Sequence, residues 1–454
     1  MVKTFRNLTL AGLLLPFAIP AFAGDTSIKE LLSGPRTPEK RSKLKLCVEA
    51  DPAAAEEILQ AALNDENTVE YRCSALAALG ACQGKAATAG LLLALNDKNT
   101  AVQSCAIRAA GDSKSGAAIK PLLANIEKYL ASARDNGPYE ANLKARLKAI
   151  DSIWELGEIG SAEVMNKFET FYLASDNTLR INLVISMGKL EANPYSAPYL
   201  RKLAASPQEA EVVRAAAFEM LDGLGQEASV GGLVRSKELG VETGDLLYTG
   251  GIIGDIGSWF NPDLPIGHTS IFLGTEVIDG RIYVQITDCV PDWFVPPGAR
   301  NINLWKYFTH QFKFPFYGSR TSKVPPTREQ REKIVKLGRE MGAKGYTYNN
   351  SHFAPKGPKE FDCVGYTEYI YEQAGVNPTP DDFETGLGWP LTPWEQFEAT
   401  VSHVLPRVPY RAAANTAPGS SAQRTSSEIL KKGLFGVSGE LPEINAEINP
   451  EKAD

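Results

Sequence analysis

The sequence predicts a multidomain chain, in which an N-terminal all-α solenoid is followed by a C-terminal α+β domain. The first observation is a set of Ala- and Leu-rich helical segments that end in Gly and recur up to about residue 228. The second is a change in composition after that point, where Gly, Pro, aromatic and β-branched residues replace the Ala/Leu/Glu pattern. A chain of 454 residues is long enough for about two or three domains with separate cores.

The N-terminus is typical of a secretory signal peptide, which we place at residues 1–23. Lys3 and Arg6 precede a mostly apolar run from Leu8 to Ile19, and Ala-Phe-Ala at 21–23 forms a small-residue cleavage site. No later stretch approaches the ~18 consecutive apolar residues that a membrane-spanning helix requires. We therefore expect a periplasmic or secreted protein without a membrane span.

The charge pattern argues against nucleic-acid binding, because the net charge is −7 and the Lys and Arg residues are dispersed. Six cysteines are present: Cys47, Cys73, Cys82, Cys105, Cys289 and Cys363. In an exported chain the first four can form disulfides, and three full connectivities are possible. The last two lie far from these and are either free or paired with each other.

Residues 24–235 carry an internal repeat. "LNDENT" at 63–68 and "LNDKNT" at 95–100 are 32 residues apart, and each precedes an Ala-rich helical pattern that ends in Gly. The pattern returns in segments that end at Gly157 and Gly188. Helical pairs at this period predict an α-solenoid, and the segment resembles short HEAT-like repeats. Tetratricopeptide repeats rank second because their Trp and Pro positions are missing. Such a solenoid can hold a protein partner.

Residues 240–410 predict an α+β domain. The stretch from His268 to Cys289 is typical of a β-hairpin, with Asp279-Gly280 as a type I′ turn. Helical patterns follow at 327–343 and again after residue 361. Residues 411–454 begin with an Ala/Ser/Thr-rich stretch and end in an acidic segment, so we expect a mostly disordered tail.

The stretch "KEFDCVGYTEYIYEQAG" at 359–375 places a cysteine at the start of an amphipathic helix. Asp362 can cap the first turn and Gly375 can end the helix, while Cys363 faces inward. Backbone N–H groups and the helix dipole at this end favour a thiolate and can hold an oxyanion. The alternative is that Cys363 is a small buried hydrophobic residue.

A cysteine nucleophile needs a base, which is usually a histidine. The four candidates are His268, His310, His352 and His403. His268 opens a predicted strand beside a Gly, where it can meet a helix N-terminus. His352 lies eleven residues before Cys363 and is the second candidate. We expect the other two to be structural or exposed.

Four motifs carry a resemblance to the NlpC-type papain-like superfamily. They are "GD" at 244–245, "GHTSIFLG" at 267–274, "KGYTY" at 344–348 and "FDCVGYTEYIYEQAG" at 361–375. Here the His strand precedes the Cys helix by 95 residues. That order is similar to the circularly permuted branch, which includes YiiX-like bacterial proteins and lecithin retinol acyltransferase. The resemblance covers about 240–410 and excludes the first domain.

The resemblance implies that Cys363 is the nucleophile and His268 the general base. The third residue falls on the second strand of the hairpin, where this sequence offers Gln285, Thr287 and Asp288. With a turn at 279–280, alternation along the strands places Gln285 and Thr287 on the face of His268. Gln285 has family-like chemistry and ranks first. Asp288 is a stronger electrostatic partner, but it needs a β-bulge to face the site and ranks second.

The resemblance implies a thiol hydrolase that cleaves an amide bond, and the expected export favours cell-wall peptides as its substrate. No metal or organic cofactor is implied. Tyr248 or Tyr346 can supply a hydroxyl near the oxyanion. Val364 follows the cysteine where relatives often carry Ser, which leaves the substrate class open. Two alternatives remain: hydrolysis or transfer of a lipid or ester acyl group, and a non-catalytic scaffold that binds a partner through the solenoid.

Overall fold

The structure, a computed structural model, describes residues 27–34, 38–82, 84–134, 142–190, 194–250, 265–292, 294, 296–305, 314–349, 359–379 and 391–402. The chain divides into two compact units, Met1–Arg407 and Val408–Asp454. The second unit, the expected tail at 411–454 and the expected signal peptide at 1–23 lie outside the described residues.

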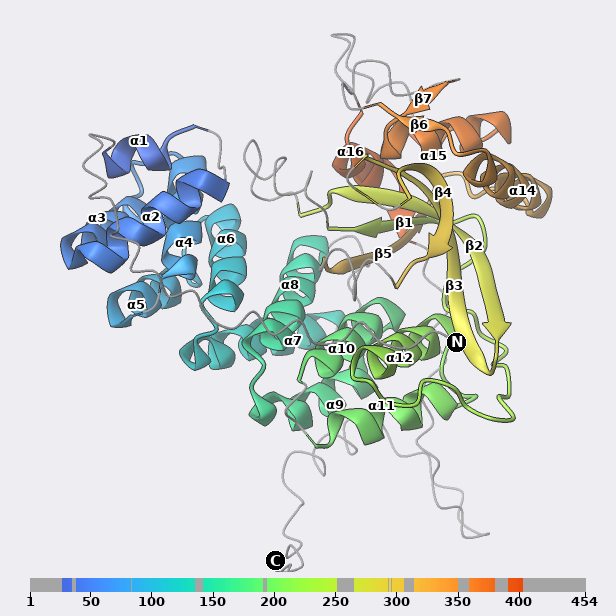
Figure 1. The fold of residues 1–454 in the computed structure, drawn as a ribbon, viewed down its shortest axis with the longest axis horizontal. Helices are drawn as coiled ribbons and strands as arrows, with labels where there is room; N and C mark the ends of the chain where they lie inside the picture. The colour runs from blue at the N-terminus through green and yellow to red at the C-terminus, as the bar shows by residue number, and fades with distance from the viewer. Residues whose placement is uncertain are drawn as a thin grey trace, which may run out of the picture. The chain divides into compact units, whose positions relative to one another are not determined.

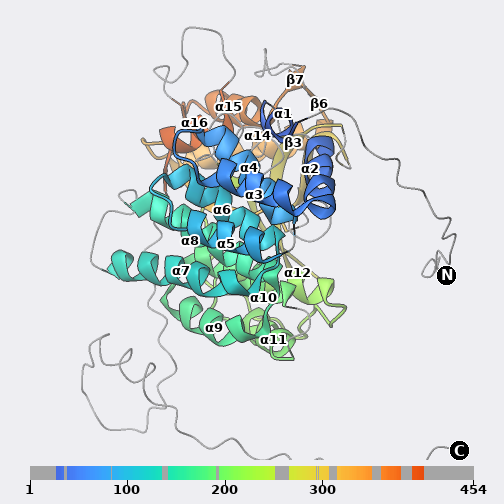
Figure 2. The same ribbon diagram turned by 90° about the vertical axis from the view of Figure 1, so that its left-hand side faces the viewer.

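The first half of the chain is helical (Figure 1). Its helices are α1 (Ile28–Leu32), α2 (Pro38–Ala50), α3 (Pro52–Leu63), α4 (Val69–Ala81), α5 (Lys85–Ala94), α6 (Thr100–Asp112), α7 (Ile119–Arg134), α8 (Leu143–Ile159), α9 (Met165–Ala174), α10 (Asn177–Lys189), α11 (Ser196–Ala205) and α12 (Glu211–Gly223), with short 3-10 turns at Gly116–Ala118 and Ala162–Val164. Helices α4, α6, α8, α10 and α12 each contact the next member of this series, and the helices follow one another as neighbouring layers in Figure 2.

The glycines that end the repeated pattern are points of close helix approach. A Cβ atom on any of them would clash with the next helix of the series: Gly80 with Ala109, Gly111 with Glu155, Gly157 with Ser186 and Gly188 with Met220. The recurrence of Gly in the sequence therefore has a packing cause, since a side chain at these positions would push the helices apart.

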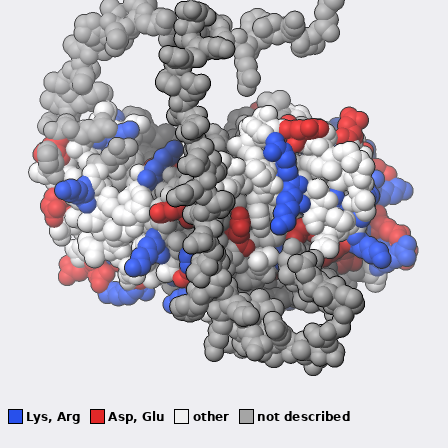
Figure 3. Space-filling view, turned by 90° about the horizontal axis from the view of Figure 1, so that it is seen from below, with Lys and Arg blue, Asp and Glu red and all other residues white. Residues whose placement is uncertain are grey.

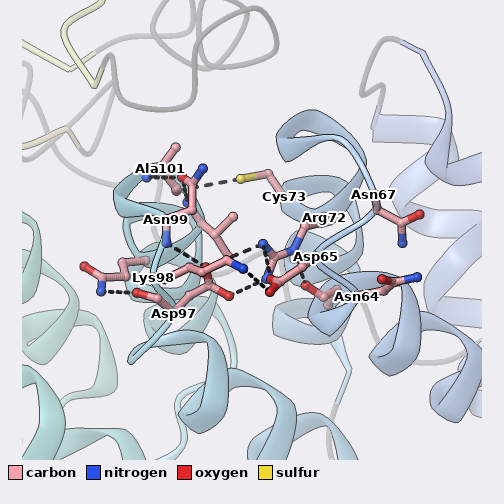
Figure 4. Close-up of polar contacts among 12 residues, drawn as sticks. Asn64, Asp65, Asn67, Arg72, Cys73, Asp97, Lys98, Asn99 and Ala101 are labelled. Carbon is pink, nitrogen blue, oxygen red and sulfur yellow. Dashed lines mark hydrogen bonds and ion pairs between the residues drawn. The ribbon is translucent and has the colours of Figure 1, made fainter.

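The repeated "LND" segments form a polar junction between successive helix pairs (Figure 4). Arg72 of α4 donates from Nε to the carbonyl oxygen of Ala62 at 2.9 Å and pairs with Asp97 of the next segment and, at 3.3 Å, with Asp65. Lys98 also pairs with Asp65. Because Arg72 is buried, these partners satisfy a charge that would otherwise be costly.

One disulfide joins two of these helices. Cys73 of α4 and Cys105 of α6 are bonded with a Cα–Cα distance of 5.5 Å, and their separation of 32 residues equals the spacing of the repeated segments. The other four cysteines, Cys47, Cys82, Cys289 and Cys363, form no disulfide. The four N-terminal cysteines thus form one bridge, between equivalent positions of successive repeats.

The second half contains a six-stranded antiparallel sheet in the order β4-β3-β2-β1-β5-β8. Its strands are β1 (Leu246–Thr249), β2 (His268–Ile278), β3 (Arg281–Val290), β4 (Gly298–Asn303), β5 (Phe316–Thr321) and β8 (Val401–Ser402). The hairpin turn expected at Asp279-Gly280 is confirmed: both residues have positive φ, at 51° and 72°, and Ile278 pairs with Arg281.

Helices α14 (Arg328–Lys344) and α15 (Cys363–Gln373) contact each other, and both contact β2 and β3 (Figure 1). The expected helix at 327–343 is therefore present, with Thr327 as its N-cap. Between them, β6 (Thr347–Tyr348) and β7 (Glu360–Phe361) form a short parallel pair. Helix α16 (Pro393–Ala399) contacts α15. The described chain is thus of mixed α and β class, as expected.

Buried hydrogen bonds join the helical part to the sheet. The Asn182 side chain of α10 bonds both backbone groups of Phe316 on β5, accepting from its N–H at 3.1 Å and donating to its carbonyl at 2.7 Å. The next residue, Tyr317, donates its hydroxyl to Asp151 of α8 at 2.7 Å. These contacts cross the boundary that the sequence places between residues 235 and 240, and both sides belong to one compact unit.

None of the helices within the described ranges combines the length and the apolar character that crossing a membrane requires. The described surface in Figure 3 carries basic and acidic side chains interspersed among uncharged ones. The mixture of charges on this face agrees with the dispersed Lys and Arg residues of the sequence.

Candidate active site

Cys363 is the first residue of α15. Asp362 caps the helix by accepting a hydrogen bond from the Gly365 N–H at 2.7 Å, and Gly375 follows the helix with a φ of 78°. The expected cap and stop are both confirmed. The Cys363 side chain is buried, with 3% of the residue exposed. The cap and the stop thus define a helix whose first residue, Cys363, points its thiol into the protein.

His268 is the first residue of β2 and contacts a carboxylate on β3. His268 Nε2 lies 3.1 Å from Asp288 Oδ2, and Asp288 is fully buried. The backbone N–H of Thr269, the next residue, lies close enough to the Cys363 sulfur to lower the pKa of the thiol. The structure therefore brings the predicted nucleophile, the predicted base and an acid into one place.

The expectation that Gln285 orients His268 is wrong. A β-bulge at Leu273 shifts the register, so that Gly274 pairs with Gln285 but Phe272 pairs with Ile286. One extra residue on β2 reverses which residues of β3 share the His268 face. Asp288 is thereby placed on that face, as the second-ranked alternative required.

Gln285 and Thr287 have other partners. Gln285 donates to Glu276 Oε2 at 3.2 Å, beyond the bulge and toward the hairpin turn. Thr287 donates to the Arg300 carbonyl at 3.0 Å, and its hydroxyl lies 2.7 Å from the Tyr366 hydroxyl of α15. Thr287 thus fixes α15 against the sheet, and Gln285 takes no part in the site.

Arg300 of β4 completes the environment of Asp288. Arg300 Nε donates to Asp288 Oδ1 at 2.9 Å, and the arginine is nearly fully buried. Burial alone would raise the pKa of Asp288, but the charges of Arg300 and His268 outweigh burial and lower the pKa below its ordinary value. Asp288 is therefore an ionised carboxylate at neutral pH. The sequence analysis did not identify Arg300.

The expectation of a stabilised thiolate is wrong for the protein without substrate. Burial raises the pKa of Cys363 well above that of a free thiol, and the neighbouring Asp362 carboxylate raises it further. The backbone N–H groups of Thr269 and Val364 act in the opposite direction but do not compensate. Desolvation of a full charge exceeds the effect of two N–H dipoles. Cys363 is a thiol in this state.

A second cysteine lies close to the first. Cys289 follows Asp288 on β3, is fully buried, and donates its thiol to the Phe361 carbonyl at 3.4 Å. Burial raises the pKa of Cys289, and the charges of Asp288 and Cys363 raise it further. Both cysteines are reduced, so the alternative of a bridge between them is not realised in this structure.

Three tyrosines can now be placed. Tyr248 is buried, and its hydroxyl donates to Gln396 Oε1 at 3.1 Å, on the side of α16. Tyr346 packs its ring against Phe361 at 5.4 Å between centroids. Tyr348 also lies near the site, and its pKa is raised by burial and then by Cys363 and Asp362. Sequence reasoning missed it, although it is the Tyr that follows Gly345 at the third position.

The remaining candidates lie outside the described residues. These are His310, His352 and His403, so the second-ranked base is not placed. Comparison of the chain with protein-family models and with curated proteins finds no match. The function of the protein is therefore inferred from the geometry around Cys363.

Proposed function

We propose that this protein is an exported thiol hydrolase with Cys363 as nucleophile, His268 as general base and acid, and Asp288 as the residue that orients the imidazole. The observation that carries the proposal is one chain of contacts. Helix α15, which begins at Cys363, packs against β2, where the Thr269 N–H acts on the Cys363 thiol, and the adjacent His268 contacts the ionised Asp288. A nucleophile, a base and an orienting acid are the three parts of a thiol hydrolase site.

The proton must move during the reaction because Cys363 rests as a thiol. Since His268 Nε2 is bonded to Asp288, the other ring nitrogen, Nδ1, takes the thiol proton as the sulfur attacks the acyl carbon. The imidazolium then gives this proton to the leaving nitrogen as the C–N bond breaks. Water attacks the resulting thioester, and its proton passes through His268 to the departing sulfur. Backbone N–H groups at the start of α15 stabilise the oxyanion.

We further propose that the sheet with α14 and α15 is a permuted papain-like domain and that α1–α12 form a HEAT-like solenoid. The order of the His strand and the Cys helix supports the first assignment. The recurring glycine contacts support the second. The Cys73–Cys105 disulfide supports a periplasmic or secreted location, because such bonds persist in oxidising compartments.

A thiol-directed probe tests the function. Iodoacetamide bearing a reporter should label the folded chain, and Cys363→Ala should abolish most of that labelling. Cys289→Ala is the matched control, since it removes the neighbouring buried thiol and leaves the nucleophile. Because Cys47 is a partly exposed thiol that can also react, labelled positions are located by peptide mapping. A folded protein in which Cys363 does not label would leave the binding scaffold as the better interpretation.

The substrate class is then decided with purified protein. We propose peptide amides of the bacterial cell wall, by analogy with exported members of the resembling superfamily. Cell-wall peptides and acyl esters are incubated with the wild type and with Cys363→Ala. Release of a new amine from the peptides by the wild type alone supports the amidase. Turnover of esters alone would favour the lipid or ester acyl hydrolase.

A further inference from the structure

Arg300 is held by more contacts than a buried countercharge needs. It pairs with Asp288 across the β3–β4 register, with Nε at 2.9 Å from Oδ1 and Nη2 at 3.5 Å from Oδ2. Its Nη1 donates to the Pro296 carbonyl at 3.1 Å, and the guanidinium lies 5.3 Å from the centre of the Phe294 ring. A planar guanidinium fixed at three points holds the plane of its carboxylate partner.

The two carboxylate oxygens of Asp288 face different partners. Oδ1 accepts from Arg300 Nε, and Oδ2 lies 3.1 Å from His268 Nε2. The direction of Oδ2, and so the orientation of the imidazole, follows from how Arg300 holds the carboxylate. We propose that Arg300 is a positioning residue of this site, which keeps Asp288 ionised and aimed so that His268 carries its proton on Nε2 and uses Nδ1 toward Cys363. This inference rests on the proposed function.

The charge of Arg300 has a second consequence. A buried carboxylate whose sole countercharge is an adjacent imidazole favours the imidazolium, because the pair is then neutral. Arg300 already supplies that countercharge, so Asp288 does not require an imidazolium beside it. The Arg300–Asp288 pair is also consistent with a protonated Cys363. Because Arg300 balances the charge of Asp288, the site does not need an imidazolium, with a thiolate beside it, for that purpose.

The positioning role of Arg300 can be tested by measuring which ring nitrogens of His268 carry a proton. In protein labelled with ¹⁵N-histidine, NMR at pH 7 distinguishes a ring protonated at Nε2, at Nδ1 or at both nitrogens, and His268→Gln assigns the signal. The wild type should show Nε2–H alone. Arg300→Met should gain a second ring N–H, whereas Arg300→Lys, which keeps the charge, should keep the wild-type pattern.

Arg328→Met is the matched control. Arg328 is 93% exposed and pairs with Glu332 one helical turn away, so this variant should keep the wild-type pattern. A buried arginine that merely stabilises the fold would give a different result for Arg300→Met, namely a lower melting temperature with His268 still protonated at Nε2 alone. That outcome overturns the proposal.

A second comparison decides the matter even if Arg300→Met does not fold. The double variant Arg300→Met/Asp288→Asn removes both charges, so no unpaired charge is buried. If Arg300 acts on His268 through Asp288, the double variant and Asp288→Asn alone should have identical ring patterns. Different patterns would mean that Arg300 acts by another route. None of these signals depends on the reactivity of Cys363, so failure of the hydrolase proposal would appear separately, as absent probe labelling.

Discussion

The candidate site and the contact between the helices and β5 each bury an aspartate, and the two aspartates behave in opposite ways. Asp288 at the site has a lowered pKa because Arg300 and His268 together outweigh its burial. Asp151 of α8 has its pKa raised by burial to about 6, because the more modest effects of Arg108 and the Tyr317 hydroxyl do not compensate. The pKa of a buried carboxylate falls below its ordinary value only where the opposite charges around it outweigh the cost of burial.

The difference matches what each region has to do. An acid orients an imidazole more strongly as a carboxylate than as a neutral carboxyl, and Arg300 keeps Asp288 ionised. An acid that joins α8 to β5 needs only to accept the Tyr317 hydroxyl, which either protonation state can do. Substitutions at the site should therefore change reactivity, and substitutions at the helix–sheet contact should change stability.

The largest expected effect is at the site. His268→Ala should slow iodoacetamide labelling of Cys363 by about 10²-fold, because a buried thiol then lacks its base. The melting temperature should change little, since Asp288 keeps Arg300 as a partner. Labelling rates of folded protein at pH 7 provide the measurement. An unchanged rate would mean that another group, such as His352, takes the proton.

Asn182→Ala should have the largest effect on stability. It leaves the N–H and the carbonyl of Phe316 buried without these partners, which costs about 2–4 kcal/mol of unfolding free energy. Urea denaturation measures the loss, and labelling of Cys363 below the transition should stay at the wild-type rate. Asn166→Ala, at an exposed position of α9, is the control and should stay within about 0.5 kcal/mol. Equal effects of the two variants would contradict the helix–sheet contact.

Asp151→Asn should stabilise the protein at neutral pH. The folded-state pKa of Asp151, about 6, lies above its ordinary value of 3.8, so the wild type loses stability as pH rises between these values. The variant cannot ionise, and its unfolding free energy should exceed that of the wild type by about 3 kcal/mol at pH 7 and by little at pH 4. Urea denaturation at both pH values gives the difference.

A companion variant checks the sign of this pH dependence. Tyr317→Phe removes the hydroxyl that lowers the pKa of Asp151, so the loss of stability should extend to higher pH. A difference between Asp151→Asn and the wild type that is the same at pH 4 and pH 7 would show that Asp151 does not titrate between those values.

Local features of the fold were predictable from the sequence. The Asp362 cap, the Gly375 stop and the turn at Asp279-Gly280 each depend on residues within one turn of chain, and all three are confirmed. Distant contacts were not predictable in this way. The bonds between Asn182 and Phe316 join residues 134 positions apart, and no local pattern marks either residue as a partner.

The sequence predicted the positions of Cys363 and His268, but it ranked Asp288 second and did not identify Arg300 or Tyr348. Pairing the residues of β2 and β3 one by one, starting from the turn, selects Gln285 as the partner of His268. This pairing is correct only as far as Gly274. There the bulge at Leu273 changes which residues of β3 lie on the same face of the sheet as His268. Gly274 has a φ of 125°, which a residue with a side chain rarely adopts. An isolated Gly inside a strand is the available signal for a bulge, and it stands in "FLGTEV". Giving that signal more weight would have selected Asp288.

The smallest expected effect tests this correction. Gln285→Ala removes an exposed hydrogen bond to Glu276, so it should change the unfolding free energy by less than about 0.5 kcal/mol. Labelling of Cys363 should stay within about twofold of the wild type, because no described contact joins Gln285 to His268. Asp288→Asn is the paired variant and should slow labelling about tenfold or more, since a neutral amide orients the ring less strongly than a carboxylate. If Gln285→Ala instead slows labelling as much as Asp288→Asn does, the register beyond Leu273 differs from the one described, and alternation without a bulge would account for the site.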